Sequence, residues 1–223
     1  MGGLQLIQTV CRYLTDSQSV SHGVSYAACV ATQAERREAT RRRLIDAARQ
    51  RFATDGYDHT STEDIRRQAG VSRGAMYHHF ASKRELFEAV FREVSDETIR
   101  GAIGQGGSGE SRLDDLSRAC LAWLREVRHP HAAAILLDQG PHVLGWQRAR
   151  DLEAETSLGL MEVALQQASA AGEIDVVSVP LTARLLNAIL AEAALVALND
   201  APATAAVELE QTIRQFIEGL TPA

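Results

Sequence analysis

The sequence predicts an all-α protein with a small N-terminal domain of three helices and a larger C-terminal helical bundle. Three observations indicate this fold class. Aromatic residues make up only 5% of the 223 residues, while Ala and Leu are plentiful, which disfavours a β-sandwich or barrel. Apolar residues recur at spacings of three and four along most of the chain, the period of an amphipathic helix. A glycine-rich stretch over residues 101–111 contains little to bury and is expected to connect the two domains flexibly.

The composition excludes several classes of protein. Apolar residues account for 45% of the chain and charged residues for 23%, as in ordinary soluble globular proteins. No apolar run approaches the roughly 20 residues needed to span a bilayer, so we expect no membrane partner. The cysteines Cys11, Cys29 and Cys120 form neither a disulfide framework nor a zinc pattern. We therefore expect a cytoplasmic protein without a cofactor.

The net charge of -6 is unevenly distributed. Residues 36–84 contain 12 Lys and Arg against 6 Asp and Glu, whereas the remainder contains 11 against 23. A basic segment in an acidic chain indicates that one part of the molecule meets an anionic partner. A solvated basic surface with no partner is the alternative that charge alone leaves open.

Three parts of the chain follow from these patterns. Residues 1–34 are expected to be a disordered N-terminal extension, with a short amphipathic helix inside it as the alternative. Residues 35–82 are expected to form the N-terminal domain. Residues 83–223 are expected to form the C-terminal domain, in which residues 83–100 are a connecting helix.

The N-terminal domain is expected to begin with a helix over about residues 35–54. Its apolar positions Leu44, Ala48 and Phe52 repeat every four residues. After the third helix of the domain, Ser82 and Glu85 have the spacing of a capping box, in which the serine hydroxyl takes the N3 amide and the glutamate reaches back to the cap amide. This pattern predicts the start of the connecting helix.

Residues 61–80 have the length and pattern of a helix, a glycine-containing turn and a second helix. Gly70 suits the left-handed residue that ends the first of these helices, and Ser72 suits the cap of the second. The free amides at a helix N-terminus favour a phosphate. The pattern is therefore that of a helix-turn-helix.

The second helix of this motif has an outward face that is small at its start, then aromatic and polar. At 100° per residue, one arc of this helix contains Arg73, Gly74, Tyr77 and His78. Such a face can enter a major groove of DNA. An aromatic residue on a helix is often part of a core, but two successive histidines outside the apolar stripe favour contact with DNA.

The C-terminal domain is predicted to be helical throughout. The expected helices run over residues 112–128, from 130 to a break at 141–145, and over 146–171, 180–199 and 202–220. Apolar residues of the last two helices alternate at spacings of three and four, as in paired helices. The first of these two helices is apolar nearly all round, so a second copy of the chain is expected to cover it. The predicted dimer contacts are Leu186, Ile189, Ala193, Val196, Leu209, Ile213 and Phe216.

The helix-turn-helix and its surroundings resemble the DNA-binding domain of the tetracycline-repressor (TetR) family. The resemblance covers residues 40–94 and is dense. It is carried by Ile45–Phe52, Gly56-Tyr57, Thr60-Ser61, Asp64-Ile65, Ala69–Ser72, Gly74, Tyr77–Phe80, Lys83 and Leu86-Phe87. The helical remainder is similar to the family in architecture but contains no motif that we can name.

The resemblance implies a homodimeric transcriptional repressor that binds palindromic double-stranded DNA and releases it when a small-molecule effector enters the C-terminal domain. Thr60, Ser61 and Lys83 are then expected to contact phosphate, and the helix after Ser72 to contact base edges and phosphates. The positions that match the family's motif, together with the basic run before it, give the expected DNA-binding residues. They are Arg42, Thr60, Ser61, Ser72, Arg73, Gly74, Ala75, Tyr77, His78, His79 and Lys83.

One residue departs from the family pattern. Arg66 stands where the family usually has alanine, in the first helix of the motif. A side chain of this length has to point to solvent or to the DNA backbone. The departure puts in question how closely the two helices of the motif pack.

The predicted effector pocket has only a weak signature. Residues on helices that flank the expected cavity are Trp123, Leu136, His142, Trp146 and Arg150. A dimeric DNA-binding protein without an effector is the first alternative, and a closed C-terminal core would favour it. An enzyme or a metal-binding protein is the second, but we predict no catalytic residues and no metal ligands, because no phosphate loop, nucleophile elbow or metal-ligand spacing is present.

Overall fold

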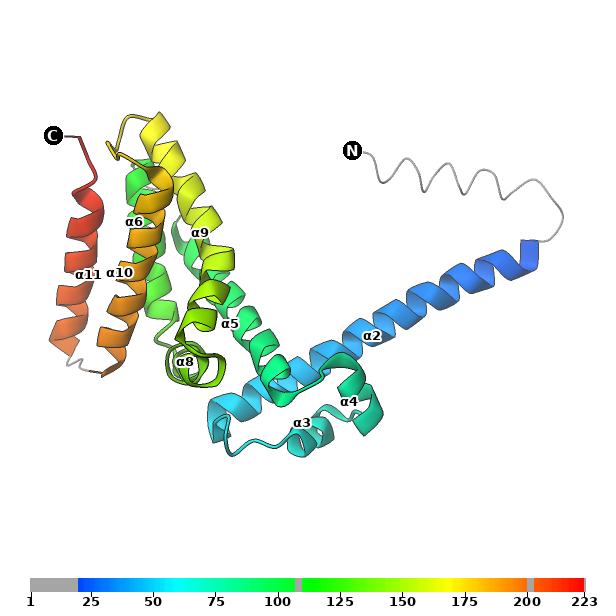
Figure 1. Cartoon of the computed structure of the whole chain (residues 1–223). Helices are drawn as coiled ribbons and strands as arrows, with labels where there is room; N and C mark the ends of the chain where they lie inside the picture. The colour runs from blue at the N-terminus through cyan, green and yellow to red at the C-terminus, as the bar shows by residue number, and fades with distance from the viewer. Residues whose placement is uncertain (1–19, 107–109, 200–202, 223) are drawn as a thin grey trace. The chain divides into compact units, whose positions relative to one another are not determined.

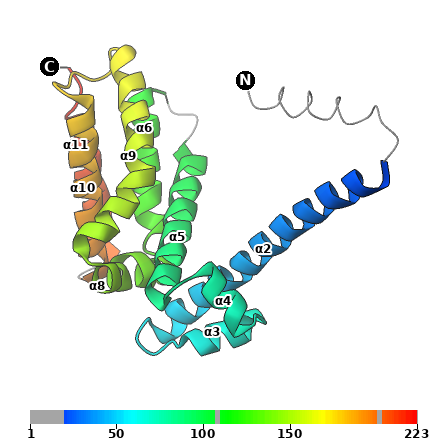
Figure 2. The ribbon, with the colours of Figure 1, turned by 45° about the vertical axis from the view of Figure 1, so that its right-hand side comes forward.

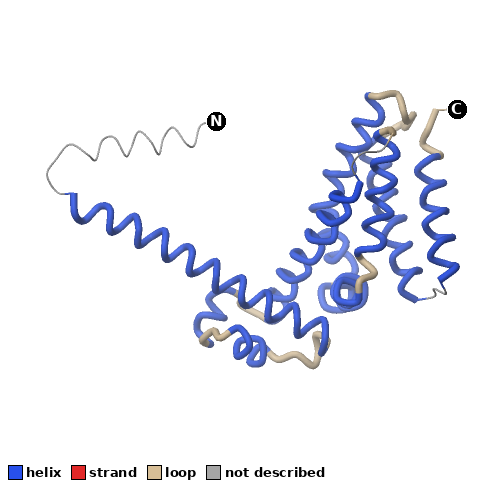
Figure 3. The backbone as a smooth tube through the Cα atoms, turned by 180° about the vertical axis from the view of Figure 1, so that it is seen from behind, coloured by secondary structure: helices blue, strands red, loops and turns tan. Residues whose placement is uncertain are grey.

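The computed structural model describes residues 20–106, 110–199 and 203–222, which contain helices and connecting loops and no strand (Figure 3). The predicted all-α class is therefore confirmed. The chain divides into two compact units, residues 1–43 and 44–223. In chain order the helices are α2 (Val20–Asp55), α3 (Thr62–Ala69), α4 (Arg73–His79), α5 (Lys83–Gly106), α6 (Arg112–Glu126), α7 (Pro130–Ala133), the π-helix η1 (Ala134–Gln139), α8 (Gly140–Leu144), α9 (Trp146–Ala170), α10 (Val179–Asn199) and α11 (Ala203–Glu218) (Figure 1).

The first unit contributes the N-terminal part of α2. This helix begins at Val20, earlier than the expected start near residue 35. The segment 20–34 contains no proline and four alanines, which are the strongest helix formers, so no local signal stops the helix there. The rest of the predicted extension, residues 1–19, lies outside the described residues.

The second unit begins with a helix-turn-helix domain around an aromatic cluster. Phe52 of α2 and Phe87 of α5 are fully buried, and their rings lie 5.2 Å apart at 63°. Tyr57, in the loop after α2, packs against both rings at 5.5 and 5.3 Å. Ile65 of α3 and Met76 of α4 are buried in the same core. The burial of these apolar side chains holds the three helices and the start of α5 together.

Local caps define the two helices of the motif as the sequence predicts. Ser61 caps α3 by accepting the Asp64 amide at 3.1 Å, and Ser72 caps α4 by accepting the Ala75 amide at 3.2 Å. Gly70 ends α3 in the left-handed conformation, with φ 63°. A side chain at this φ would be strained, which explains the glycine.

The start of α5 differs in one detail from the predicted capping box. The Ser82 hydroxyl accepts the Glu85 amide at 3.1 Å, as expected. The Glu85 carboxylate accepts the amide of Ala81 at 2.7 Å, one residue before the expected cap amide. The glutamate therefore binds the amide of the residue just before the cap.

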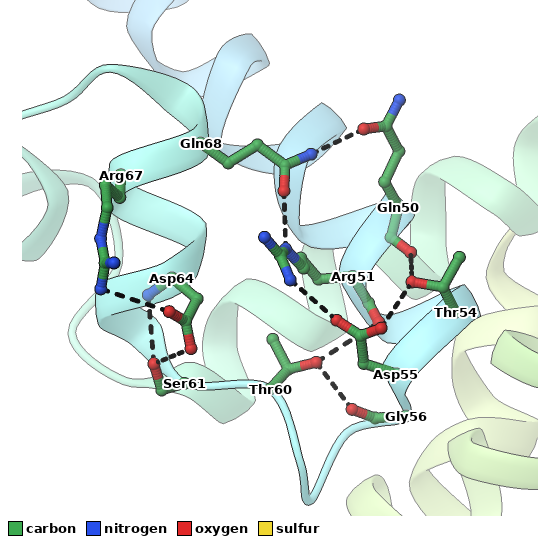
Figure 4. A network of polar contacts seen from close by, with 10 residues as sticks. All are labelled: Gln50, Arg51, Thr54, Asp55, Gly56, Thr60, Ser61, Asp64, Arg67 and Gln68. Carbon is green, nitrogen blue, oxygen red and sulfur yellow. Dashed lines mark hydrogen bonds and ion pairs between the residues drawn. The ribbon is translucent and has the colours of Figure 1, made fainter.

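Polar side chains join α2 to α3 outside the core (Figure 4). The Arg51 guanidinium donates to the Gln68 side chain at 2.7 Å and to the Asp55 carboxylate at 3.0 Å. Gln68 in turn donates to Gln50 at 2.6 Å. This network fixes the orientation of the first helix of the motif.

The C-terminal bundle is built on α5, which is longer than expected. Residues 101–106 were predicted to belong to a flexible connection, but α5 continues to Gly106. Ile99 and Ala102 are buried, so tertiary packing overrides the low helix propensity of the glycines. Along its length α5 packs against α6, while α9 packs against both α6 and α10 (Figure 2). The helix α11 covers α6 and α10.

Between α6 and α9 the chain forms three short helical pieces, α7, η1 and α8. Gly140 lies where η1 meets α8, and a Cβ built there would come within 2.5 Å of Phe91 Cε2. A glycine is thus required for the close approach of α8 to α5. A break was predicted over residues 141–145, but α8 extends to Leu144. Gly145, with a φ of 86°, separates α8 from α9.

The apolar helix α10 corrects one expectation. Its segment Val179–Leu198 has a mean hydropathy of 1.7 over 20 residues, so by length and composition it could cross a membrane. In the structure this helix packs against α6, α9 and α11, with Ala183, Leu190 and Ala194 buried. Its hydropathy is therefore explained by its place in the bundle.

The predicted dimer contacts separate into two groups. Leu186, Ala193 and Ile213 are buried within this chain, so the expectation that they face a second copy is wrong. Their spacing of three and four serves the packing of α10 and α11 inside the subunit. Of the others, Ile189 and Leu209 are half-buried, whereas Val196 and Phe216 are exposed.

Candidate nucleic-acid interface and ligand cavity

The outer face of α4 carries the side chains that the sequence assigns to DNA. Arg73, Gly74 and His78 are exposed, and Tyr77 is 47% exposed, whereas Met76 between them is buried. The Arg73 guanidinium carbon lies 5.9 Å from the centre of the Tyr77 ring. A large aromatic side chain next to a cation, both turned to solvent, is suited to contact phosphates and base edges.

Ala75 and His79 of α4 and the cap residue Ser72 are placed differently from the exposed residues of this face. Ala75 packs partly against the core, so the expected direct contact with bases is restricted. His79 is half-buried, with its ring 5.6 Å from that of His78. The hydroxyl of Ser72 is engaged in capping, and the residue is exposed at the N-terminus of the helix.

Thr60 does not lie on the surface, so the expected phosphate contact is wrong. Its side chain is 2% exposed. The hydroxyl donates to the Gly56 carbonyl at 2.7 Å and lies 3.3 Å from the Arg51 carbonyl (Figure 4). Burial of a hydroxyl requires such a partner. Thr60 therefore holds the loop between α2 and α3 to the end of α2.

Ser61 and Arg42 remain at the surface. Ser61 is exposed, and its hydroxyl also lies 2.5 Å from the Asp64 carboxylate, to which it donates. This hydrogen bond lowers the pKa of Asp64, so a negative charge stands beside the residue expected to meet phosphate. Arg42 is exposed on α2 within the first unit.

Lys83 was expected to hold a phosphate through its side chain and its amide, but the side chain has other partners in the structure. Its ammonium donates to the Tyr57 carbonyl at 2.7 Å and to the Thr60 carbonyl at 2.9 Å. The same nitrogen lies 4.0 Å from the centre of the Tyr57 ring. Partial burial lowers the pKa of Lys83. The side chain is therefore turned inward, where it supports the loop between α2 and α3.

Arg66, the residue that departs from the family pattern, strengthens the motif. Its guanidinium pairs with the Glu63 carboxylate, with an Nε–Oε2 distance of 2.9 Å. A second nitrogen donates to the Val71 carbonyl at 2.9 Å, and the Val71 amide donates to the Arg66 carbonyl at 3.1 Å. The side chain and the backbone of Arg66 thus both hydrogen-bond to Val71, in the turn before α4.

A cavity of about 350 Å³ lies within the C-terminal bundle, between α5, α6, α9 and α10. Its lining is mostly apolar, and its volume is in the range of small-molecule sites. Trp123 and Leu136, two of the residues expected in an effector pocket, line it. An open interior of this kind disfavours the alternative of a closed core that only dimerises.

The other three predicted pocket residues are not in this cavity. Trp146 and Arg150 border a separate void of about 20 Å³, where the guanidinium carbon lies 5.8 Å from the centre of the indole. His142 has a side chain that is 72% exposed and lies 3.6 Å from the Asp58 carboxylate. These residues are placed at the α8–α9 junction, which the sequence pattern could not distinguish from the cavity wall.

The polar residues of the cavity, which also include Ser95, Arg112 and Asp115, were missed by the sequence prediction. Glu153, Ser157, Asn187 and Gln167 line it, and the Ser157 hydroxyl donates to the Asn187 side chain at 3.0 Å. Burial raises the pKa of Glu153 from 4.5 to about 7, and the nearby Arg150 opposes this effect. The one available signal is the spacing of residues 153, 157, 160, 164 and 167, which places them on one face of α9.

Hydrogen bonds connect the wall of the cavity to the helix-turn-helix domain. The Gln139 side chain at the end of η1 donates to the Phe52 carbonyl at 2.9 Å. Arg84 of α5 donates to the carbonyls of Val143 and Leu144, at 3.2 and 3.0 Å. Since Leu136 of η1 lines the cavity, one short segment contacts both regions.

A three-helix domain with an exposed helix after a glycine turn, followed by a hollow helical bundle, defines the class of helix-turn-helix regulators. Two family models match the chain accordingly. Residues 44–90 match the model for bacterial regulatory proteins of the tetR family, and residues 113–220 match that of a tetracyclin repressor-like C-terminal domain. The chain belongs to the TetR family of transcriptional regulators.

Individual relatives agree with this assignment. The chain is 39% identical over 74 residues to the HTH-type transcriptional repressor Rv1474c of Mycobacterium tuberculosis, covering 33% of this chain and 40% of that protein. The match thus spans less than half the length of that relative. A TetR-family regulator from Pectobacterium atrosepticum has a similar structure, with a TM-score of 0.72 and 25% identity over 85% of this chain and 97% of its own. RolR in complex with resorcinol shares the fold at 17% identity, with a TM-score of 0.68, over 85% and 91% of the two chains.

Proposed function

We propose that this protein is a repressor that binds a palindromic operator as a homodimer and responds to a small-molecule effector. The observation that carries the proposal is the outer face of α4, where Arg73, Tyr77 and His78 are exposed over a buried Met76. An operator requires the protein to be in the cytoplasm with the chromosome. The name of the Mycobacterium tuberculosis relative supports repression as the direction of control.

In the proposed complex each subunit places α4 in a major groove. Two half-sites about one helical turn apart, or slightly more, would match the two-fold symmetry of a dimer. Backbone contacts near Ser61 and Ser72 would set the position on DNA, while Arg73, Gly74 and Tyr77 would face bases. Gly74 has nothing within 4 Å of a Cβ built on it, so the groove wall can approach the backbone there.

The effector is proposed to act through the segment that links the cavity to the DNA-binding domain. A ligand against Leu136 would bias the position of η1, and the hydrogen bonds from Gln139 and Arg84 would carry the change to α2 and α5. The ligand shifts the equilibrium only by its different affinity for the two arrangements. RolR, whose structure was solved with resorcinol, supports a small molecule in this fold.

The test is fluorescence anisotropy of the protein on DNA from upstream of its own gene and on a randomised pool, across a salt series. Tyr77→Ala is expected to cost about 1–3 kcal/mol in operator binding without changing the secondary structure or the oligomeric state. The affinity of the unmodified protein should fall steeply as salt increases, because phosphate contacts release counterions.

Trp146→Ala is the matched control, because Trp146 is exposed to a similar extent, 52%, but lies on α9. This variant should bind the operator like the unmodified protein. Unchanged affinity of Tyr77→Ala would show that α4 is not the recognition helix. The absence of any specific site in the randomised pool would overturn the proposed function.

A further inference from the structure

The cavity is elongated along α9. Glu153, Ser157, Met161, Ala164 and Gln167 all line it from this one helix. Their spacings of four, four, three and three place them on a single face. At a rise of 1.5 Å per residue this face extends for about 20 Å, so a long, narrow ligand fits better than a compact one.

The two ends of the lined face differ in chemistry. Toward the end of α9, the lining residues Leu160 and Val163, together with Ile103 of α5, are apolar and about half exposed. The charged residues Arg112 and Asp115, at the start of α6, also line the cavity. The three apolar side chains form a mouth through which a hydrophobic chain can pass. At the other end of the lined face, near the start of α9, the lining residue is Glu153, whose side chain is a carboxylate.

The Glu153 side chain is mostly buried and lacks a direct partner. Within the described part of the chain, no hydrogen bond or ion pair reaches its carboxylate. Arg150 is the charged group that acts on it, and the Arg150 guanidinium lies over the Trp146 ring. A carboxylate in such surroundings is costly unless a cation or a hydrogen-bond donor arrives.

We propose that the cavity binds an amphiphilic amine, with its ammonium group against the Glu153 carboxylate and its apolar chain along Met161 and Ala164 toward the mouth. The inference rests on the proposed function, because it names the chemical class of the effector. With its head group at Glu153, a fatty acid would place a second carboxylate beside this residue, and an alcohol would leave the Glu153 charge without a counterion. The cation Arg112 also lines the cavity, so decanoate is included among the probes. An amphiphilic amine can pack its chain against the apolar wall and pair its ammonium group with the Glu153 carboxylate.

Three probes with the same chain and different head groups test the proposal: decylamine, decanol and decanoate. Isothermal titration at pH 8, where Glu153 is largely ionised, should give the amine an affinity roughly tenfold or more above that of decanol, as expected for a charge-assisted hydrogen bond in a partly buried site. Decanoate should bind most weakly. Glu153→Gln should remove the preference for the amine and leave the affinity for decanol unchanged.

Asp151→Asn is the matched control, because Asp151 is an exposed acid on the same helix that does not line the cavity. This variant should keep the full preference for the amine. Equal affinities for amine and decanol, an unchanged preference in Glu153→Gln, or no binding of any probe would each overturn the inference. The measurement uses no DNA, so these results leave operator binding by the same protein as a separate test of the proposed function.

Discussion

Lys83 supports the loop between α2 and α3 from inside the DNA-binding domain. Its ammonium satisfies the carbonyls of Tyr57 and Thr60, and it lies over the Tyr57 ring. The buried Thr60 hydroxyl ties the same loop to the end of α2. These two side chains determine where Ser61, and with it the start of α3, is placed.

Lys83→Met is therefore expected to lower the free energy of unfolding by about 1–2 kcal/mol, because two carbonyls lose a charged donor. Denaturant unfolding measures this loss. The slope of log affinity for the operator against log salt should stay as in the unmodified protein, since the side chain meets no phosphate. A slope reduced by about one would instead identify Lys83 as a phosphate contact.

Glu153 makes the stability of the fold depend on pH. Burial raises its pKa from 4.5 to about 7, so the folded state holds the proton more tightly than the unfolded state. The stabilisation is complete below pH 4.5 and is lost as pH rises through about 7. By linkage this amounts to about 3 kcal/mol between the two limits.

Glu153→Gln removes this dependence. Relative to the unmodified protein, the variant should gain stability at pH 8 and show a much smaller difference at pH 5. Urea unfolding of both proteins at the two pH values measures the gain. A difference that is the same at both pH values would show that Glu153 titrates normally.

At the scale of elements, the turn between α3 and α4 depends on Arg66. The guanidinium connects Glu63 of α3 with the Val71 carbonyl, which follows the left-handed Gly70. The angle between the two helices of the motif is thus set by one side chain in addition to the core. This arrangement explains how a long residue is accommodated at a position where the family usually has alanine.

Arg66→Ala is expected to lower the thermal midpoint and to weaken operator binding, because the Val71 carbonyl loses its donor and the turn loosens. Arg67→Ala is the matched control, since Arg67 is 69% exposed and pairs with Asp64 at 3.4 Å on the solvent side. That variant should retain the thermal midpoint. Equal midpoints for the two variants would contradict a role of Arg66 in the turn.

The helices and caps of the motif were predictable because their signals are local. Ser61, Ser72 and Gly70 act on amides and carbonyls within a few residues, so sequence spacing is enough to place them. Thr60 and Lys83 were misplaced, since their partners are a folded loop and the end of another helix. Spacing alone likewise does not show which acidic residues of α9 face the interior.

The whole molecule presents an apolar surface that one chain leaves uncovered. Leu185 on α10 and Phe216 on α11 are 57% and 56% exposed, and Leu181 and Val196 on α10 are also exposed. The seam predicted from spacing lies inside the subunit, so the surface proposed to meet a second copy is the outer one. Leu186, one of the predicted dimer contacts, is buried. A charge introduced there by Leu186→Glu would therefore disrupt folding and would not report on dimer assembly.

Phe216→Glu and Leu185→Glu are expected to convert the proposed dimer to monomers, since a charge in the interface would lose its hydration without a partner. Sedimentation velocity measures the change, and circular dichroism checks that the helices are retained. Val177→Glu is the control, because Val177 is fully exposed in the loop before α10. Dimers in both interface variants would place the interface elsewhere.

The position of Trp123 has a consequence for optical spectroscopy. Of the two tryptophans in the chain, Trp123 lines the cavity, whereas Trp146 is half exposed outside it. Indole emission responds to the polarity of its surroundings, so displacement of water from the cavity changes the light emitted by Trp123 and leaves that of Trp146 nearly constant. The protein therefore contains its own fluorescent reporter, and compounds can be screened for entry without labels and before any operator is known.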